Sequence, residues 1–331
     1  MTTIATSITD LIGHTPLLEL QKYSTNRGLR ARLLAKLEYL NPLGSVKDRT
    51  AWSIIRQAEE SGALQPGGTI VDVTSGNTGI SLAAIAARHG YRTKFYLSDN
   101  ISPDKITLLQ AFGADVVTVP NVNFADPPFL ATLVERIRTE NPDAYFTDQL
   151  ANPANPQAHY STTGPEIWAD TDGQVDILVT GVGTGGTVTG TAKYLREHNP
   201  DLQVVLAEPG LGSLPTEENP YPHEIDGVHK VTEVETEYLP DNFDPAAPTE
   251  VIALETADAR TAAQALAAEE GLLIGTSAGA ITWVATQLAQ RPENAGKTIV
   301  AVLPDSGERY LAAGTFATAS AQTDGRVPQP A

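Results

Sequence analysis

The sequence contains no cysteine among its 331 residues, and its one methionine is Met1. Without cysteine the chain cannot form disulfides, use a thiolate nucleophile, or bind an iron–sulfur cluster or Cys-ligated zinc. Positive charge is also scarce, with 22 Lys and Arg against 40 Asp and Glu and a formal net charge of −18. Because nucleic acids and anionic membranes bind clusters of Lys and Arg, neither is expected as a partner.

Long apolar runs are missing as well. No segment approaches the roughly 18 apolar residues of a membrane span. The opening MTTIATSITDLIGHT lacks the basic and apolar regions of a secretory signal. The chain is 41% hydrophobic and 19% charged, which is typical of a folded globular protein. The length is that of about two domains, and we expect a cytoplasmic enzyme.

Short β-branched or apolar runs alternate with longer segments of helical period. The strand-like runs are GTIVDV (68–73), TKFYL (93–97), DVVTVP (115–120), VDILVT (175–180), LQVVLAE (202–208) and KTIVAVLP (297–304). Glycines that are suited to end the intervening helices are Gly62, Gly90, Gly113 and Gly271. Strand followed by helix, repeated, predicts an α/β fold with largely parallel sheets.

Three segments interrupt this pattern. Residues 148–167 are rich in Asn, Pro and Gly, lack a helical period and could form a domain junction. Residues 209–247 form a second irregular stretch, and a loop of that length is usually functional. Residues 315–331 have the Ser, Thr, Ala and Pro composition of a disordered tail.

A glycine-rich turn follows the strand-like run at 175–180. Its sequence GVGTGG satisfies G-x-G-x-x-G through Gly181, Gly183 and Gly186. Glu208 follows about where a dinucleotide-binding fold keeps its ribose-binding acid, so an NAD-dependent dehydrogenase is one hypothesis. The mid-chain position of the motif argues against it. Additional donors make a dense cradle that suits a single phosphate group better: Thr184, Gly185 and Thr187.

A second polar turn, TSGNTG, follows the strand-like run at 68–73. It places four polar side chains at the start of a helix: Thr74, Ser75, Asn77 and Thr78. Ordinary N-capping explains one hydroxyl there, whereas the whole set suits a small carboxylate. Weaker turns of the same kind contain Ser277 and the pair Asp305 and Ser306. The P-loop pattern is absent, so hydrolysis of nucleoside triphosphates is not expected.

Lys47 stands in an electrostatically unfavourable place. In NPLGSVKDR, Ser45 is suited to be the N-cap of a helix and Asp48 its N3 residue, which puts Lys47 at N2 in the first turn. The helix dipole opposes a cation there. The same field, together with any burial, lowers the pKa of the amine, as Schiff-base chemistry requires. The alternative is a solvated surface lysine, but the chain has only eight lysines.

The histidines give little support for other chemistry. His223 and His229 flank Asp226, which is a weak pattern for a metal site. Neither H-E-x-x-H nor G-x-S-x-G occurs, so no metal is expected and a Ser-His-Asp hydrolase has no support.

Several motifs occur in the order of a known family: IGHTPLLEL, NPLGSVKDR, TSGNTG, NPANPQAHYSTTGPEI, GVGTGGTVTG and PDSGERYL. With them the chain resembles the cysteine synthase (O-acetylserine sulfhydrylase) and cystathionine β-synthase family of fold-type II pyridoxal-phosphate enzymes, over roughly residues 8–312. The resemblance implies two open α/β domains of the tryptophan synthase β-like kind, with pyridoxal 5'-phosphate (PLP) in the cleft. The smaller domain would be 41–150 and the larger 1–40 plus 151–314, in a homodimer.

The resemblance also implies roles for individual residues. Lys47 would form the Schiff base with PLP and move the α-proton, and Asn77 would contact the 3-hydroxyl oxygen of the ring. Ser277 would face the pyridine nitrogen. The phosphate would be held by Gly183, Thr184, Gly185, Gly186 and Thr187. The substrate carboxylate would be bound by Thr74, Ser75, Thr78 and Gln149.

The implied reaction is β-replacement, in which L-cysteine forms from O-acetyl-L-serine and sulfide through an aminoacrylate. The loop EIDGVH departs from the family pattern. Asp226 stands where cysteine synthases commonly carry Gln and cystathionine β-synthases Glu, and His229 stands where small residues are usual. A carboxylate there could act as a base on the incoming nucleophile, so Asp226 is a candidate catalytic residue. Cysteine β-lyase or cystathionine-forming activity therefore stays open as an alternative.

Overall fold

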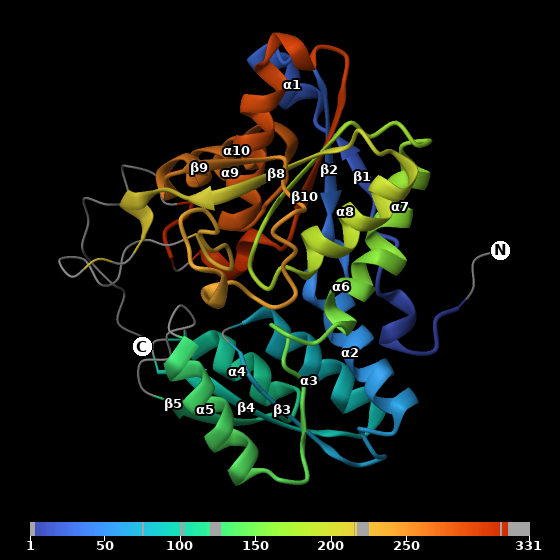
Figure 1. Ribbon diagram of the computed structural model, residues 1–331, viewed down its shortest axis with the longest axis vertical. Coiled ribbons are helices and arrows are strands. Elements are labelled where there is room, and N and C mark those ends of the chain that lie inside the picture. Colours follow the sequence, from blue (N-terminus) through green and yellow to red (C-terminus); the bar gives the residue numbers. More distant parts are fainter. Residues whose placement is uncertain are drawn as a thin grey trace, which may run out of the picture.

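Two β-sheets organise the molecule (Figure 1). The computed structural model describes residues 4–74, 76–99, 101, 103–119, 127–214, 216, 225–311 and 313–316. In spatial order, the six strands of the larger sheet are β1 (Leu17–Glu19), β2 (Arg32–Leu37), β10 (Thr298–Leu303), β7 (Ile177–Gly181), β8 (Gln203–Pro209) and β9 (Glu250–Leu254). Strand β1 pairs antiparallel with β2, and the other pairs are parallel.

The smaller sheet has four parallel strands: β5 (Asp115–Val119), β4 (Arg92–Ser98), β3 (Thr69–Val73) and β6 (Tyr145–Phe146). The helices of the described segments are α1 (Gln21–Arg27), α2 (Lys47–Ser61), α3 (Asn77–His89), α4 (Pro103–Ala111), α5 (Pro127–Glu140), α6 (Ala154–Ala158), α7 (Gly164–Asp170), α8 (Gly186–His198), α9 (Thr256–Glu270) and α10 (Thr276–Gln290). This arrangement confirms the predicted α/β fold with two mostly parallel sheets. None of these helices is long and apolar enough to cross a membrane.

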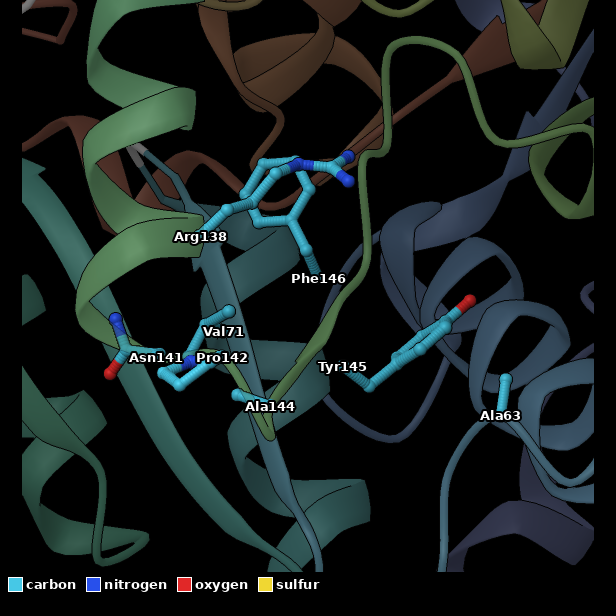
Figure 2. A pocket seen from close by; sticks show the side chains of 8 residues that line it. All are labelled: Ala63, Val71, Arg138, Asn141, Pro142, Ala144, Tyr145 and Phe146. Carbon is cyan, nitrogen blue, oxygen red and sulfur yellow. The ribbon is translucent and has the colours of Figure 1, made fainter.

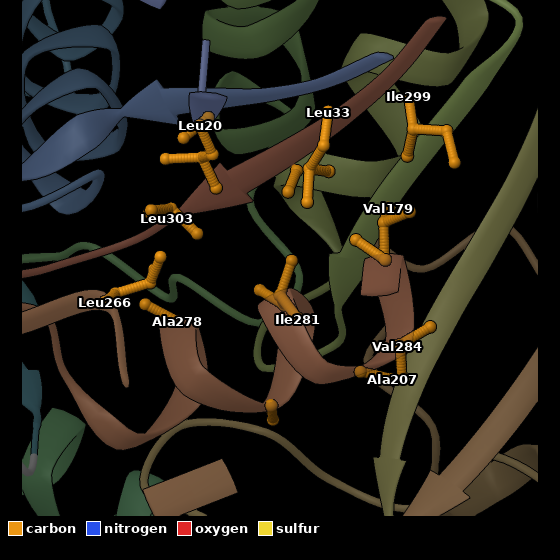
Figure 3. Close-up of a cluster of buried hydrophobic side chains, with 14 of the residues drawn as sticks. Leu20, Leu33, Val179, Ala207, Leu266, Ala278, Ile281, Val284, Ile299 and Leu303 are labelled. Atoms are coloured by element: carbon orange, nitrogen blue, oxygen red, sulfur yellow. The ribbon is translucent and has the colours of Figure 1, made fainter. Parts of the chain in front are cut away.

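The larger sheet is buried on both faces, as neighbouring residues of its central strands show. Leu33, Val179 and Ile299 belong to the core between the sheet and α10, with Ile281 and Val284 (Figure 3). The adjacent residues pack in a second core on the opposite face, against α7 and α8: Leu34, Leu178 and Val300. Full burial on both faces explains why these strands are continuous apolar runs rather than alternating ones.

The sequence-based expectation of an irregular segment at 148–167 is wrong for most of its length. Helix α6, a π-helical turn (His159–Thr163) and α7 follow one another there. Buried polar side chains, Asn155 and His159, lie beside the buried Ala154, Ala158 and Ile167 in this helical run. They interrupt the apolar periodicity that reveals most helices.

The C-terminal tail starts later than its composition suggests. Thr315 is buried and accepts a hydrogen bond from Gln264 through its carbonyl oxygen at 2.8 Å. Phe316 packs against the core of the larger sheet. The expected disorder is thus wrong for Thr315 and Phe316, and the rest of the predicted tail, 317–331, lies outside the described residues.

Candidate active site

The turn between β7 and α8 presents free backbone donors. In the part of the chain that the structure describes, no turn, loop or cap hydrogen bond is donated by the N–H groups of residues 183–188. Close packing demands glycine in this turn. A Cβ on Gly183 would lie 2.5 Å from the carbonyl oxygen of Gly227, and one on Gly186 would lie 1.9 Å from Asn155 Oδ1. The N-terminus of α8 therefore offers a preformed cradle for an anion.

Two side chains that were not predicted from the sequence contact residues of this cradle. Asn155 Nδ2 donates to Thr184 Oγ1 at 2.8 Å, while Asn155 Oδ1 accepts from Thr50 Oγ1 of α2 at 3.0 Å. His159 Nε2 lies 3.3 Å from Thr187 Oγ1. Burial, together with nearby cationic groups, lowers the pKa of His159 to about 3, so the ring is neutral. Asn155 thus connects the cradle to the helix that begins with Lys47.

Lys47 is the first residue of α2, one position earlier in the helix than predicted. Val46 is the N-cap residue, and the predicted capping box is absent because the Asp48 carboxylate accepts from the N–H of Leu43 instead. Within the described ranges, no hydrogen bond or ion pair of the Lys47 amine is formed. Burial lowers its pKa to about 8, although the carboxylate of Asp305 opposes this effect. A substantial fraction of the amine is therefore neutral and nucleophilic at mildly alkaline pH.

Asp305 follows β10 and connects Lys47 to Asn77. The backbone N–H of Val46 donates to the carbonyl oxygen of Pro304 at 2.8 Å, which brings the start of α2 to the end of β10. The buried carboxylate of Asp305 accepts from Asn77 Nδ2 at 2.7 Å and from the hydroxyl of Tyr310 at 2.5 Å. Burial raises the pKa of Asp305. Its second oxygen, Oδ1, has no hydrogen-bond partner among the described residues.

Ser277 is the second residue of α10, whose N-terminus lies beside Asp305. The N–H of Gly275 donates to the carbonyl oxygen of Asp305 at 3.1 Å. Ser277 is buried, and its hydroxyl forms no hydrogen bond with any residue described by the structure. The hydroxyl is thus available to a ligand.

The turn before α3 combines capping with free donors. The hydroxyl oxygen of Thr74 accepts from the N–H of Gly79 at 3.1 Å, so Thr74 caps the helix. The hydroxyl of Thr78 donates to Gln149 Oε1 at 2.6 Å and thereby orients the Gln149 amide. The N–H groups of Asn77 and Thr78 donate to no described residue. These donors suit a carboxylate, while Ser75 lies outside the described residues.

The loop that carries Asp226 lies against the anion cradle. The N–H of His229 donates to the carbonyl oxygen of Val182 at 2.7 Å. Asp226 is accessible to water, yet surrounding protein raises its pKa, with Lys105 and Arg260 opposing the rise. Over the described residues, no three His, Asp or Glu side chains converge to hold a metal ion. His223 lies outside those residues.

Glu208 does not provide a free carboxylate for a ribose. It accepts hydrogen bonds from the N–H groups of Val231 and Thr232, at 2.9 and 3.0 Å, and from the hydroxyl of Thr232. Lys230 pairs with the same carboxylate at 3.1 Å. The carboxylate oxygens of Glu208 are thus used to hold the 230–232 turn in place. The ribose-binding acid that the dehydrogenase hypothesis assigned to Glu208 is therefore not available.

A pocket of about 370 Å³ lies away from this site, at the β6 edge of the smaller sheet (Figure 2). Its cation, Arg138, lies over the ring of Phe146 at 5.0 Å and 3.8 Å from the carboxylate of Asp148. The pocket contains no residue that the sequence analysis singled out.

Asp48 has a buried carboxyl group whose hydrogen bonds favour its protonated form. The hydroxyl of Ser81 contacts both Asp48 Oδ1, at 2.6 Å, and the carbonyl oxygen of Asn77, at 3.0 Å. One hydroxyl proton cannot serve two acceptors, whereas a protonated Asp48 donates to Ser81 and satisfies all three groups. Burial raises the pKa of Asp48 to about 6, with Glu38 adding to the rise and Arg309 opposing it.

Asp48→Asn is therefore expected to change the pH dependence of stability. The raised pKa in the folded state means that Asp48 favours folding at acid pH and loses this contribution as pH rises from about 4 through about 6. Asn has the same shape and can donate to Ser81 at every pH. We expect the variant to gain up to about 3 kcal/mol over the parent at pH 8 and nothing at pH 4. Urea unfolding at both pH values measures this, and a variant that is less stable at pH 8 contradicts it.

The described residues fit PLP. An anion cradle, a lysine amine with a lowered pKa, a serine hydroxyl and an asparagine amide belong to one connected set around Asp305 and Asn155. They match the phosphate, aldehyde, ring nitrogen and ring oxygen of that cofactor. The fit rests on the N–H groups of residues 183–188 and the hydroxyl of Ser277, none of which bonds to a described residue.

Comparisons with known proteins agree. Residues 8–305 match the family described as pyridoxal-phosphate dependent enzyme. Cysteine synthase 3 of Caenorhabditis elegans is 42% identical, over 91% of this chain and 87% of that protein. The O-acetylserine dependent cystathionine β-synthase of Bacillus subtilis is 37% identical, over 93% and 97%. A crystal structure of cysteine synthase from Entamoeba histolytica superposes with a TM-score of 0.85 at 36% identity, over 96% and 92%. The chain therefore belongs to the family of pyridoxal-phosphate dependent enzymes, in its cysteine synthase and cystathionine β-synthase branch.

Proposed function

We propose that this enzyme forms L-cysteine from O-acetyl-L-serine and sulfide by PLP-dependent β-replacement. The observation that carries the proposal is the Lys47 amine, whose pKa is lowered to about 8. Its helix is bonded to α3 through Asp48 and Ser81, and to the start of α8 through Thr50 and Asn155. The N–H groups at the starts of α3 and α8 donate to no described residue, and they suit a carboxylate and a phosphate respectively. The relatives named cysteine synthase support the same reaction.

We assign the following roles in binding and catalysis to residues of this chain. Lys47 Nζ holds the cofactor and, once released, takes the α-proton of the substrate. The phosphate is bound by Gly183, Thr184, Gly185, Gly186 and Thr187. The ring is held by Asn77 at its oxygen and by Ser277 at its nitrogen. The substrate carboxylate is bound by Thr74, Ser75, Thr78 and Gln149. When bound, PLP supplies an electron-withdrawing ring that acidifies the α-proton.

Lys47 can move this proton because burial keeps its amine from being permanently charged. With a pKa near 8, Nζ accepts a proton and returns it within the same pH range. A neutral hydroxyl at Ser277 does not hold a ring nitrogen protonated as a carboxylate would. This favours elimination and replacement at the β-carbon over transamination.

The two sheets are proposed to form two domains, 41–150 and 1–40 plus 151–314, in a cytoplasmic homodimer. The larger sheet joins β2 to β10, and so joins the N-terminal segment to the C-terminal half.

A second candidate is cystathionine formation or cysteine β-lyase activity on the same scaffold. Asp226 favours it, because its carboxylate has a raised pKa and can take a proton from a thiol or from water. The similarity to an O-acetylserine dependent cystathionine β-synthase supports it as well.

Asp226→Asn distinguishes these activities. Homocysteine has a less acidic thiol than hydrogen sulfide, so base assistance matters more for it. We expect the variant to lose about 100-fold in rate with homocysteine and much less with sulfide. The rates of product formation from O-acetylserine are compared for sulfide, homocysteine and water in both proteins. Equal rates of parent and variant with every acceptor would remove Asp226 from the mechanism.

The reaction itself is tested by incubating the purified protein with O-acetylserine and sulfide and measuring L-cysteine. The proposal requires a yellow protein that forms cysteine under these conditions. A protein that binds PLP and converts neither O-acetylserine nor cysteine would overturn both candidate functions.

A further inference from the structure

Arg309 reaches two elements of the proposed cofactor site. It lies on a short 3₁₀ turn after β10, Gly307–Tyr310. Its guanidinium donates through Nη1 to Asn77 Oδ1 and through Nη2 to the carbonyl oxygen of Leu43. Asn77 begins α3, and Leu43 belongs to the turn that leads into Lys47. One side chain therefore connects the two helix starts that carry these residues.

The partners of Asn77 dictate the orientation of its amide. An arginine side chain only donates hydrogen bonds, so the oxygen of the amide must face Arg309. On the other side, Asn77 Nδ2 donates to Asp305 Oδ2 at 2.7 Å. The amide therefore cannot turn over without placing its NH₂ group against the guanidinium. The second N–H of Nδ2 donates to no residue that the structure describes, and a ring oxygen requires such a donor.

We propose that Arg309 is a positioning residue, which fixes the amide of Asn77 so that one N–H is presented to the 3-hydroxyl oxygen of PLP. This inference rests on the proposed role of Asn77. The same guanidinium holds the turn before Lys47, where Gly44 has a φ of +81° and a Cβ would lie 3.1 Å from Nη2. A side chain at position 44 would be strained and would crowd Arg309.

The test compares full-length variants that are purified with PLP. Arg309→Met removes every donor while keeping the length of the chain. Arg309→Lys keeps one donor nitrogen in place of the guanidinium's separate ones, and Asn77→Ala removes the amide. The double variant combines Arg309→Met with Asn77→Ala. Two quantities are measured for each protein: the free PLP concentration at half saturation, by equilibrium dialysis, and the absorption spectrum of the bound cofactor. Arg56→Met is the control, because the pair that Arg56 forms with Glu60 on α2 is exposed and lies outside the proposed site.

We expect Arg309→Met to weaken PLP binding by about 10-fold and to shift the cofactor spectrum in the same direction as Asn77→Ala. Arg309→Lys should lie between Arg309→Met and the parent. If Arg309 acts through Asn77, the double variant binds PLP within about 2-fold of Asn77→Ala.

The possible failures are distinguishable. An unchanged spectrum in Asn77→Ala would contradict the proposed role of Asn77. A changed spectrum in Asn77→Ala with parent-like behaviour in Arg309→Met would overturn the positioning role of Arg309. So would a double variant in which the two losses simply multiply. If Arg309→Met does not fold, Arg309→Lys takes its place in the comparison. Parent-like PLP binding together with a parent-like spectrum in Arg309→Lys would then overturn the inference.

Discussion

Lys47→Ala is expected to abolish cysteine formation, with a loss of about 10³-fold or more in rate. The variant removes the amine that we propose holds PLP and moves the α-proton. In the same variant, the visible absorption of the bound cofactor should disappear or shift. The reaction is followed as sulfide-dependent cysteine formation from O-acetylserine at pH 8.

The matched control is Lys193→Ala, which removes an exposed lysine of α8 that lies 5.2 Å from the ring of Tyr160. This variant should keep the parent rate within about 2-fold, because surface substitutions rarely change more than that. If Lys47→Ala keeps a tenth of the parent rate, Lys47 does not carry the chemistry.

Arg49→Met is expected to cause the largest loss of stability. Arg49 is buried two residues beyond Lys47 and binds two carboxylates at once. It contacts Glu38 at 2.7 and 2.9 Å and Glu166 at 2.7 Å through two separate bonds. The buried ammonium of Lys36 pairs with Glu166 at 2.8 Å. Burial alone would raise the pKa of Glu166, but the two cations lower it to about 2.

Without Arg49, the buried carboxylate of Glu38 loses its ion pair, and the partly buried carboxylate of Glu166 keeps its pair with Lys36. Removing one partner of a buried ion pair costs about 3–5 kcal/mol, so we expect that loss in the free energy of unfolding at pH 7. Arg56→Met is a matched control on the same helix, because its pair with Glu60 is exposed and should cost less than about 1 kcal/mol. Urea unfolding of both variants measures the difference. A loss below about 1 kcal/mol in Arg49→Met contradicts the account of this cluster.

The ion pairs of Arg49 also fix the position of the helix start that carries Lys47. Glu38 precedes α2, and Glu166 lies on α7, which packs on the larger sheet. Arg49 therefore fastens the first turn of α2 to the part of the molecule that contains the anion cradle. The predicted loss in Arg49→Met should thus be accompanied by weaker retention of PLP.

The strands and turns around the site were predictable because their signals are local. The runs at 68–73, 175–180 and 297–304 are rich in apolar and β-branched residues, and β3, β7 and β10 lie largely within them. The turns GVGTGG and TSGNTG are dense in glycine and hydroxyl groups, and both begin helices, α8 and α3. Strand β6 has only two residues and shows no period.

The supporting residues were not predictable, because their roles depend on contacts between distant segments. Asn155 and His159 interrupt the apolar pattern of their helical run, and their partners Thr184 and Thr187 are 29 and 28 residues away. Arg309 contacts Asn77 across 232 positions of sequence. A charged residue in a short turn carries no local signal of such a contact.

The attachment of PLP to Lys47 is the most direct test of the proposed mechanism. The yellow protein is reduced with borohydride, digested and analysed by mass spectrometry for the peptide that carries the reduced cofactor. The account predicts a single pyridoxyl group on the peptide that contains Lys47, with no label on the other seven lysines. A label on another lysine, or a protein that carries no reducible cofactor, would contradict it.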